Sequence, residues 1–149
     1  GLDGKKTLVY TGERPYSGEI AISTDGTRMV GRSKNHLYRI DVGGASRRYS
    51  VKCSASLSPD GTLMTRNTVS HVGLEIHRWD SSGKTGLHAQ RGTMWDNHRF
   101  AVNSNEYIAF NYDGTRSSVG VVRLSDNEIF PIGEVKSYSY IDLWVGALP

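Results

Sequence analysis

The chain has 149 residues, of which 37% are hydrophobic and 22% charged, with 17 glycines but only 4 prolines. This length suits one compact domain, and the balance of apolar and charged residues excludes a disordered or low-complexity chain. The net charge of +3 does not by itself indicate a nucleic-acid partner, the single cysteine excludes an intramolecular disulfide, and no stretch approaches the ~18 apolar residues of a membrane-spanning helix.

Short alternating apolar segments recur along the whole chain, and helical periodicity is absent. The first segment, residues 7–11, is expected to be an outer strand that flanks the units after it. Three similar units follow, with approximate bounds 18–51, 53–89 and 99–132. Residues 140–146 are expected to form one more inner strand. The sequence therefore predicts a single domain, 1–149, of about three units with two partial flanks.

Each unit begins with a hairpin signal. Asp25-Gly26 and Asp60-Gly61 lie 35 residues apart, and Asn105-Glu106 is the expected counterpart in a weaker third copy. Glycine accepts the positive φ that a tight turn between two strands demands. Two further strand-like segments follow each hairpin, so each unit supplies four short antiparallel strands. Units of this kind are typical of β-propeller blades, which stack on their neighbours to bury both faces.

The predicted fold class is therefore all-β, with about three four-stranded antiparallel β-propeller blades plus partial flanking strands. Closed propellers typically have about four to eight blades. Three blades predict a partial propeller that belongs to a larger ring, or a ring that a second copy of the chain completes.

The segment Leu57-Ser58-Pro59-Asp60-Gly61 resembles the F-S-P-D-G blade signature of TolB-like propellers. Residues 22–26 lack the proline of this signature, and residues 102–106 lack its Asp-Gly pair. The resemblance implies hairpins and no particular chemistry. Families built on the repeat include periplasmic envelope scaffolds, prolyl-peptidase propeller domains and lyases of pectin fragments. Residues 142–146 also resemble the end of propeller modules attached to bacterial polysaccharide-degrading proteins, so the resemblance implies a bacterial, polysaccharide-associated module. The compartment stays open, with a periplasmic or secreted location favoured.

Candidate functional residues follow from the blade topology. Loops from the fourth strand to the next first strand, and from the second strand to the third, emerge on one face around the central channel, where function is commonly placed. Arginines and aromatic rings in these loops suit an acidic carbohydrate or a protein segment, because guanidinium groups pair with carboxylates. The alternative is a rim whose arginines only point into water. The candidate ligand-binding residues are Tyr16, Arg32, Arg66, Trp95, Asp96, His98, Arg99 and Tyr140.

The longest of these loops ends in Trp95-Asp96-Asn97-His98-Arg99 and is the best single candidate. Trp95 is expected either to stack on a ligand ring or to pack between blades, and both alternatives stay open. Asp96 and His98 are expected to hydrogen-bond the ligand or to take part in acid–base chemistry.

The predicted function is a non-catalytic binding or scaffold module. The alternative is an enzyme, as a uronate lyase-like protein or the propeller portion of a larger hydrolase. The paired-histidine motif of the lyases is reduced to His98 alone, and common enzyme motifs are absent from the sequence, so we assign no catalytic residue, metal or cofactor. The expected partners are an acidic glycan or a protein, a second copy of the chain or the rest of a larger propeller, but neither nucleic acid nor a membrane interior.

Overall fold

The computed structural model describes residues 20–33, 36–44, 46–50, 54–68, 70–81, 84–89, 94–112, 118–134 and 141–146. These residues form twelve β-strands and no helix, which confirms the predicted all-β class. Within them, no helix is long and apolar enough to cross a membrane.

The strands form three antiparallel sheets of four, each in simple sequence order, which we call blades A, B and C. Blade A contains β1 (Ile20–Ile22), β2 (Arg28–Ser33), β3 (His36–Asp41) and β4 (Ser46–Ser50). Blade B contains β5 (Ala55–Leu57), β6 (Leu63–Asn67), β7 (Gly73–Arg78) and β8 (Lys84–Ala89). Blade C contains β9 (Asp96–Phe100), β10 (Tyr107–Tyr112), β11 (Ser118–Arg123) and β12 (Ile129–Glu134).

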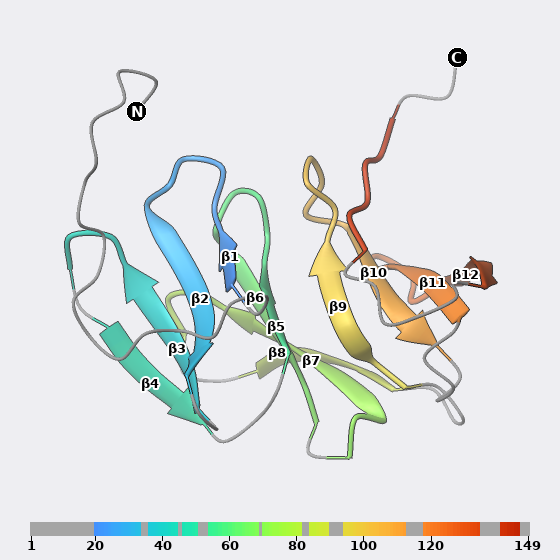
Figure 1. The fold of residues 1–149 in the computed structure, drawn as a ribbon, viewed down its shortest axis with the longest axis horizontal. Helices are drawn as coiled ribbons and strands as arrows, with labels where there is room; N and C mark the ends of the chain where they lie inside the picture. The colour runs from blue at the N-terminus through green and yellow to red at the C-terminus, as the bar shows by residue number, and fades with distance from the viewer. Residues whose placement is uncertain are drawn as a thin grey trace.

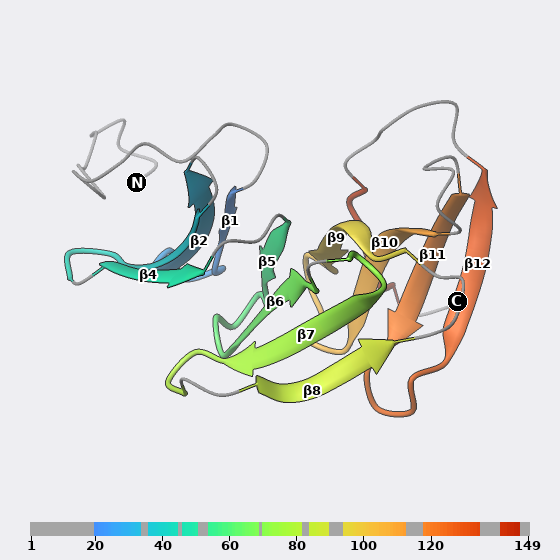
Figure 2. The same cartoon turned by 90° about the horizontal axis from the view of Figure 1, so that it is seen from below.

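The three blades spread like a fan, with the first strand of each toward the middle of the molecule (Figure 1). Seen from below, the fourth strands β4, β8 and β12 lie at the periphery (Figure 2). The prediction of three four-stranded antiparallel blades in a partial propeller is confirmed. Of the two flanks, residues 7–11 lie outside the described residues, and residues 141–146 form no regular strand.

Side-chain hydrogen bonds close the first hairpin turn of blade A. Oδ1 of Asp25 accepts hydrogen bonds from the Ser23 hydroxyl at 2.6 Å and from the Thr27 amide at 3.0 Å. These bonds lower the pKa of Asp25 to about 2, because they favour the ionised carboxylate. Gly26 takes the positive φ of 72° that the turn requires. The sequence Ser-Thr-Asp-Gly-Thr thus specifies the turn through its side chains as well as its glycine.

Blade B repeats this turn. Oδ1 of Asp60 accepts hydrogen bonds from the Ser58 hydroxyl at 2.7 Å and the Thr62 amide at 2.9 Å, and Gly61 also has a φ of 72°. Burial opposes ionisation of Asp60, but the hydrogen bonds from Thr62 and Ser58 outweigh it, so the pKa of Asp60 is lowered.

The third turn lies two residues earlier than the predicted Asn105-Glu106. The Ala101 amide donates to the Tyr107 carbonyl at 2.9 Å, as the Ser23 amide donates to Arg28 in blade A. Asn103 therefore takes the place of the turn aspartates. This turn contains one more residue than the other two, and Ser104 replaces the glycine without a positive φ. β9 begins at Asp96, before the expected start of the third unit at 99, because Asp96 pairs with Asn111 beyond a register shift in the ladder with β10.

The hydrophobic core lies between the blades and not within any one of them. The first cluster joins blades A and B and contains Val30, Leu37, Ala55, Leu57, Met64 and Trp79. The second joins blades B and C and contains Leu74, Trp95, Phe100, Ile108, Phe110 and Val122. Each fully buried aliphatic side chain of this kind contributes about 1.5–3 kcal/mol of transfer free energy. Among the described residues, each blade thus buries apolar side chains against a neighbouring blade.

Backbone hydrogen bonds also connect successive first turns. The Thr24 amide of blade A donates to the Pro59 carbonyl of blade B at 2.7 Å. In the same position of blade C, the Val102 amide donates to the Leu143 carbonyl at 2.9 Å. The Asn103 side chain adds two bonds to the backbone of Val145, at 2.7 and 2.9 Å. Residues 141–146 therefore lie beside blade C where the first turn of a further blade would lie.

Candidate functional site

Three segments of blades B and C meet at the channel face, as the blade topology predicts. They are the residue before β5, the loop between β6 and β7, and the start of β9. Oδ1 of Asp96 lies 3.3 Å from Nδ1 of His71 and 3.4 Å from the Ser54 hydroxyl. Nδ2 of Asn67 lies 3.3 Å from the same His71 nitrogen and donates to the Trp95 carbonyl at 3.2 Å. We call Ser54, Asn67, His71 and Asp96 the channel-face cluster.

The backbone has an unusual conformation at two members of this cluster and at the residue that follows Asp96. Ser54, His71 and Asn97 have positive φ values of 54°, 60° and 49°, and none of them is glycine. Residues with a Cβ atom adopt this region rarely and at a cost of about 1 kcal/mol or more each. The Trp95 amide donates to the His71 carbonyl at 2.8 Å, which ties the loop of blade B to the start of β9 in blade C. The cluster is thus built with strain that the surrounding packing sustains.

Exposure differs among the members of the cluster. The His71 side chain is 24% exposed and that of Asp96 only 10%, so the imidazole is the more accessible of the two to a ligand from solvent. The carboxylate contacts both the hydroxyl and the imidazole. This order differs from a hydrolytic triad, in which the imidazole lies between hydroxyl and carboxylate. The arrangement can orient an imidazole toward a ligand, but it does not activate the Ser54 hydroxyl.

Trp95 is a packing residue, which decides between the two alternatives for it. Its side chain is only 1% exposed and stacks on Phe110 with ring centroids 4.3 Å apart. The expectation that this ring stacks on a ligand is wrong, because both of its faces are covered in the core between blades B and C.

His98 is also part of this core and is 1% exposed. Its Nδ1 lies 3.3 Å from the Trp95 carbonyl. Burial lowers the pKa of His98 to about 4, more than the bond to the carbonyl raises it. His98 is therefore neutral at pH 7 and does not reach a ligand on the channel face, contrary to expectation.

The predicted arginines have other contacts. Nε of Arg66 donates to Oε2 of Glu75 at 2.6 Å, in a pair that lies across β6 and β7. Arg99 crosses from β9 to β1, where its Nη1 donates to the Ile20 carbonyl at 3.0 Å. Arg32 is half-buried on β2. Tyr16 and Tyr140 lie outside the described residues.

Of the predicted site residues, the structure brings Asp96 into the channel-face cluster, and the sequence analysis missed His71, Ser54 and Asn67. The topological argument already assigned the loop between the second and third strands to this face. His71 is a polar residue at the end of that loop, and this position alone could have marked it as a candidate site residue. Among the described residues, no group of three or more His, Cys, Asp or Glu side chains can hold a metal ion.

Comparisons with solved structures support the fold. The WD40 repeats of RRP9 superpose with a TM-score of 0.60 at 12% identity, over 83% of this chain and 40% of that one. TolB from Acinetobacter baumannii gives 0.62 at 15% identity, over 83% and 34%. The structure of U3-55K gives 0.63 at 12% identity, over 87% and 43%.

This chain therefore spans 34–43% of the length of these three proteins. No protein-family model and no curated protein sequence matches it. At these identities the likeness concerns the fold alone, and it agrees with the strand order and blade stacking described above. The chain folds as three blades of a β-propeller.

Proposed function

We propose that the chain is a non-catalytic binding module whose ligand, an acidic carbohydrate or a protein segment, contacts the channel face at His71. The observation that carries this proposal is the left-handed backbone at Ser54, His71 and Asn97, all beside Asp96. Local strain of this kind is concentrated at functional sites, where it positions a side chain before the ligand arrives.

The buried carboxylate of Asp96 favours binding over catalysis. It contacts the His71 ring and restricts its motion, so the partly exposed imidazole can meet a ligand without a large loss of side-chain entropy. A uronate lyase or hydrolase needs a base placed against a reacting atom, and the Ser54 hydroxyl contacts the carboxylate instead of an imidazole. The F-S-P-D-G resemblance at residues 57–61 supports a TolB-like, bacterial envelope setting for such a module.

The test is a glycan and peptide array, followed by titration of the best ligand with the full chain. His71→Ala removes the exposed ring, and Val72→Ala, at a 52% exposed neighbour in the same loop, is the matched control. Loss of a charge-assisted hydrogen bond weakens binding about 10- to 100-fold. Unchanged affinity in His71→Ala, or equal loss in both variants, would refute the proposal.

We further propose that these blades work within a larger ring. Ile20 and Ile22 of β1 are 38% and 53% exposed, whereas Ala21 between them packs into the core on the opposite face of the strand. Another blade, from a longer chain or a second copy, would cover them. Light scattering gives the molar mass: a dimer supports closure by a second copy, and a monomer at high concentration excludes it.

A further inference from the structure

A second cleft lies between blades A and B at the opposite end of the strands from the channel face. It has a volume of about 280 Å³ and is lined by Arg39, Asp41, Arg47, Trp79 and Asp80. His71 precedes β7 and Trp79 follows it. Six strand residues rise about 20 Å, so the cleft and the channel-face cluster are separate sites.

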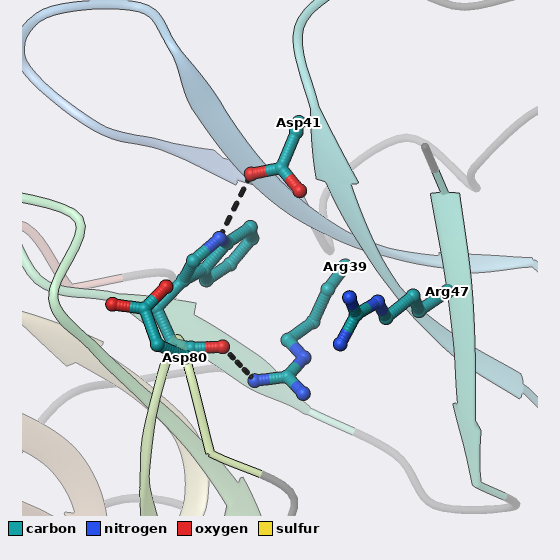
Figure 3. Close-up of a pocket in the computed structure, with 5 residues that line it drawn as sticks. Arg39, Asp41, Arg47 and Asp80 are labelled. Atoms are coloured by element: carbon teal, nitrogen blue, oxygen red, sulfur yellow. Dashed lines mark hydrogen bonds between the residues drawn. The ribbon is translucent and has the colours of Figure 1, made fainter. Parts of the chain in front are cut away.

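One wall of the cleft is rigid. The Trp79 indole N–H donates to Oδ1 of Asp41 at 2.9 Å, and Nη1 of Arg39 donates to the Trp79 carbonyl at 2.5 Å (Figure 3). The guanidinium groups of Arg28 and Arg39 each lie 5.6 Å from the centroid of the Trp79 ring. Trp79 is 5% exposed and Arg39 also 5%, so both side chains keep their positions when a ligand enters.

Blade A contributes an uncommon pair of like charges to the cleft. Arg39 on β3 and Arg47 on β4 are direct cross-strand partners, and both side chains line the cleft (Figure 3). Like charges directly opposite each other destabilise a sheet unless something neutralises them. Arg47 is exposed, so its planar group is available to a ligand from solvent.

Counting charges around the cleft gives a small positive excess. Arg28 lies 3.8 Å from Asp80 and joins Arg39 and Arg47 as a third cation, whereas Asp41 and Asp80 are the two anions. The net formal charge of these five groups is +1, which favours a ligand with one negative charge. A dianion such as phosphate would meet two carboxylates in the same small space.

We propose that this cleft binds a hydroxylated monocarboxylate of about the size of a sugar acid. Its carboxylate pairs with the Arg47 guanidinium beside Arg39, and its hydroxyl groups donate to Asp41 and Asp80 on the other side. The volume of the cleft is near the lower end of ligand pockets, about 300 Å³, which suits a single ring-sized molecule and not a long polymer segment.

The proposal can be tested by nuclear magnetic resonance, through the indole N–H signal of Trp79. The indole N–H of Trp79 lines the cleft, whereas Trp95 is buried between blades B and C and Trp144 is 70% exposed elsewhere. Titration of the full chain with glucuronate is expected to shift the Trp79 signal alone, with a dissociation constant of about 1 mM for a ligand of this size. Glucose and inorganic phosphate are the neutral and dianionic controls.

Two neighbouring arginines make a matched pair of variants. Arg47→Gln is expected to weaken glucuronate binding about tenfold or more. Arg48→Gln removes an equal charge from the next residue of β4, whose side chain points to the other face of the sheet, and is expected to leave binding unchanged. Both side chains are exposed, but Arg48 contacts the His36 ring on β3, so the urea midpoint of each variant is measured as a folding control.

The proposal is overturned if glucuronate does not shift the Trp79 signal at 20-fold the expected dissociation constant. The proposal is also overturned if Arg48→Gln weakens glucuronate binding as much as Arg47→Gln, or if phosphate binds more tightly than glucuronate. Either result would mean that the overall positive charge of the protein attracts the anion. His71→Ala must leave this titration unchanged, and it thereby separates failure of the cleft from failure of the channel-face site.

Discussion

Alanine variants of two turn glycines, Gly26 and Gly61, can measure how closely blade B packs against blade A. Both have a φ of 72°, so alanine at either position pays the same backbone cost of about 1–2 kcal/mol. At Gly61 an added Cβ would lie 2.9 Å from Cδ of Arg28 and 3.1 Å from Cβ of Ser23, both in blade A. At Gly26 no atom lies within 4 Å of the added Cβ.

The difference between the two variants therefore reports the fit of blade B against blade A. Crowding in a packed contact costs about 1–3 kcal/mol more. Arg28 yields only in part, because its Nη1 donates to the Gly61 carbonyl at 3.0 Å. We expect Gly26→Ala to lower the free energy of unfolding by about 1–2 kcal/mol and Gly61→Ala by about 2–5 kcal/mol.

Urea unfolding followed by tryptophan fluorescence measures both values, provided that the m-value is the same for the two variants. Adding Arg28→Ala to Gly61→Ala should recover part of the loss, and a double-mutant cycle isolates that part. Equal losses in Gly26→Ala and Gly61→Ala would refute the reasoning, because the contact with blade A would then contribute nothing.

Three further predictions follow from burial and ionisation. His98 stays neutral down to about pH 4 when folded but protonates near pH 6.5 when unfolded, so its contribution to the free energy of unfolding should fall by about 3 kcal/mol as the pH is lowered between those values. His98→Gln should therefore reduce the slope of stability against pH in urea titrations. The pKa of Asp25 is lowered to about 2, so its stabilising contribution is complete above about pH 4 and lost as the pH falls toward 2; Asp25→Asn should unfold with a smaller pH dependence there. Trp95→Ala should cost about 3–5 kcal/mol in the same assay, whereas Trp144→Ala, at a 70% exposed side chain, should change stability by less than about 0.5 kcal/mol.

Much of the fold was predictable because the turn chemistry is local. Asp25-Gly26 and Asp60-Gly61 specify their hairpins within five residues, so the pattern can be recognised without knowledge of any other blade. The third turn was misplaced because Asn103 and Ser104 form it with one extra residue and without glycine. Nothing in the local sequence distinguishes that longer turn from the expected Asn105-Glu106.

The candidate site was less predictable because the burial of its side chains depends on how one blade packs against the next. Trp95 and His98 stand in a segment that has the composition of an exposed loop, yet both side chains are only 1% exposed, and Phe110 of β10 stacks on Trp95. Arg66 has Glu75 directly opposite it on β7, a pairing that depends on strand register. The importance of His71 depends on Asp96, 25 residues away, and such a contact follows only from the stacked arrangement.

Pro59 removes one backbone hydrogen bond from the contact between blades B and C. The backbone N–H groups of Thr24 and Val102 donate to the segment that follows their blade. Pro59 occupies the same position in blade B and has no N–H group to donate. The Asp60 amide donates instead to the Asn105 side chain at 3.4 Å. At the far end of the same junction, the Trp95 amide holds the His71 carbonyl at 2.8 Å. A ligand that binds this arrangement of the loop would therefore stabilise the contact between blades B and C, and its binding would oppose their separation by heat or by mechanical force.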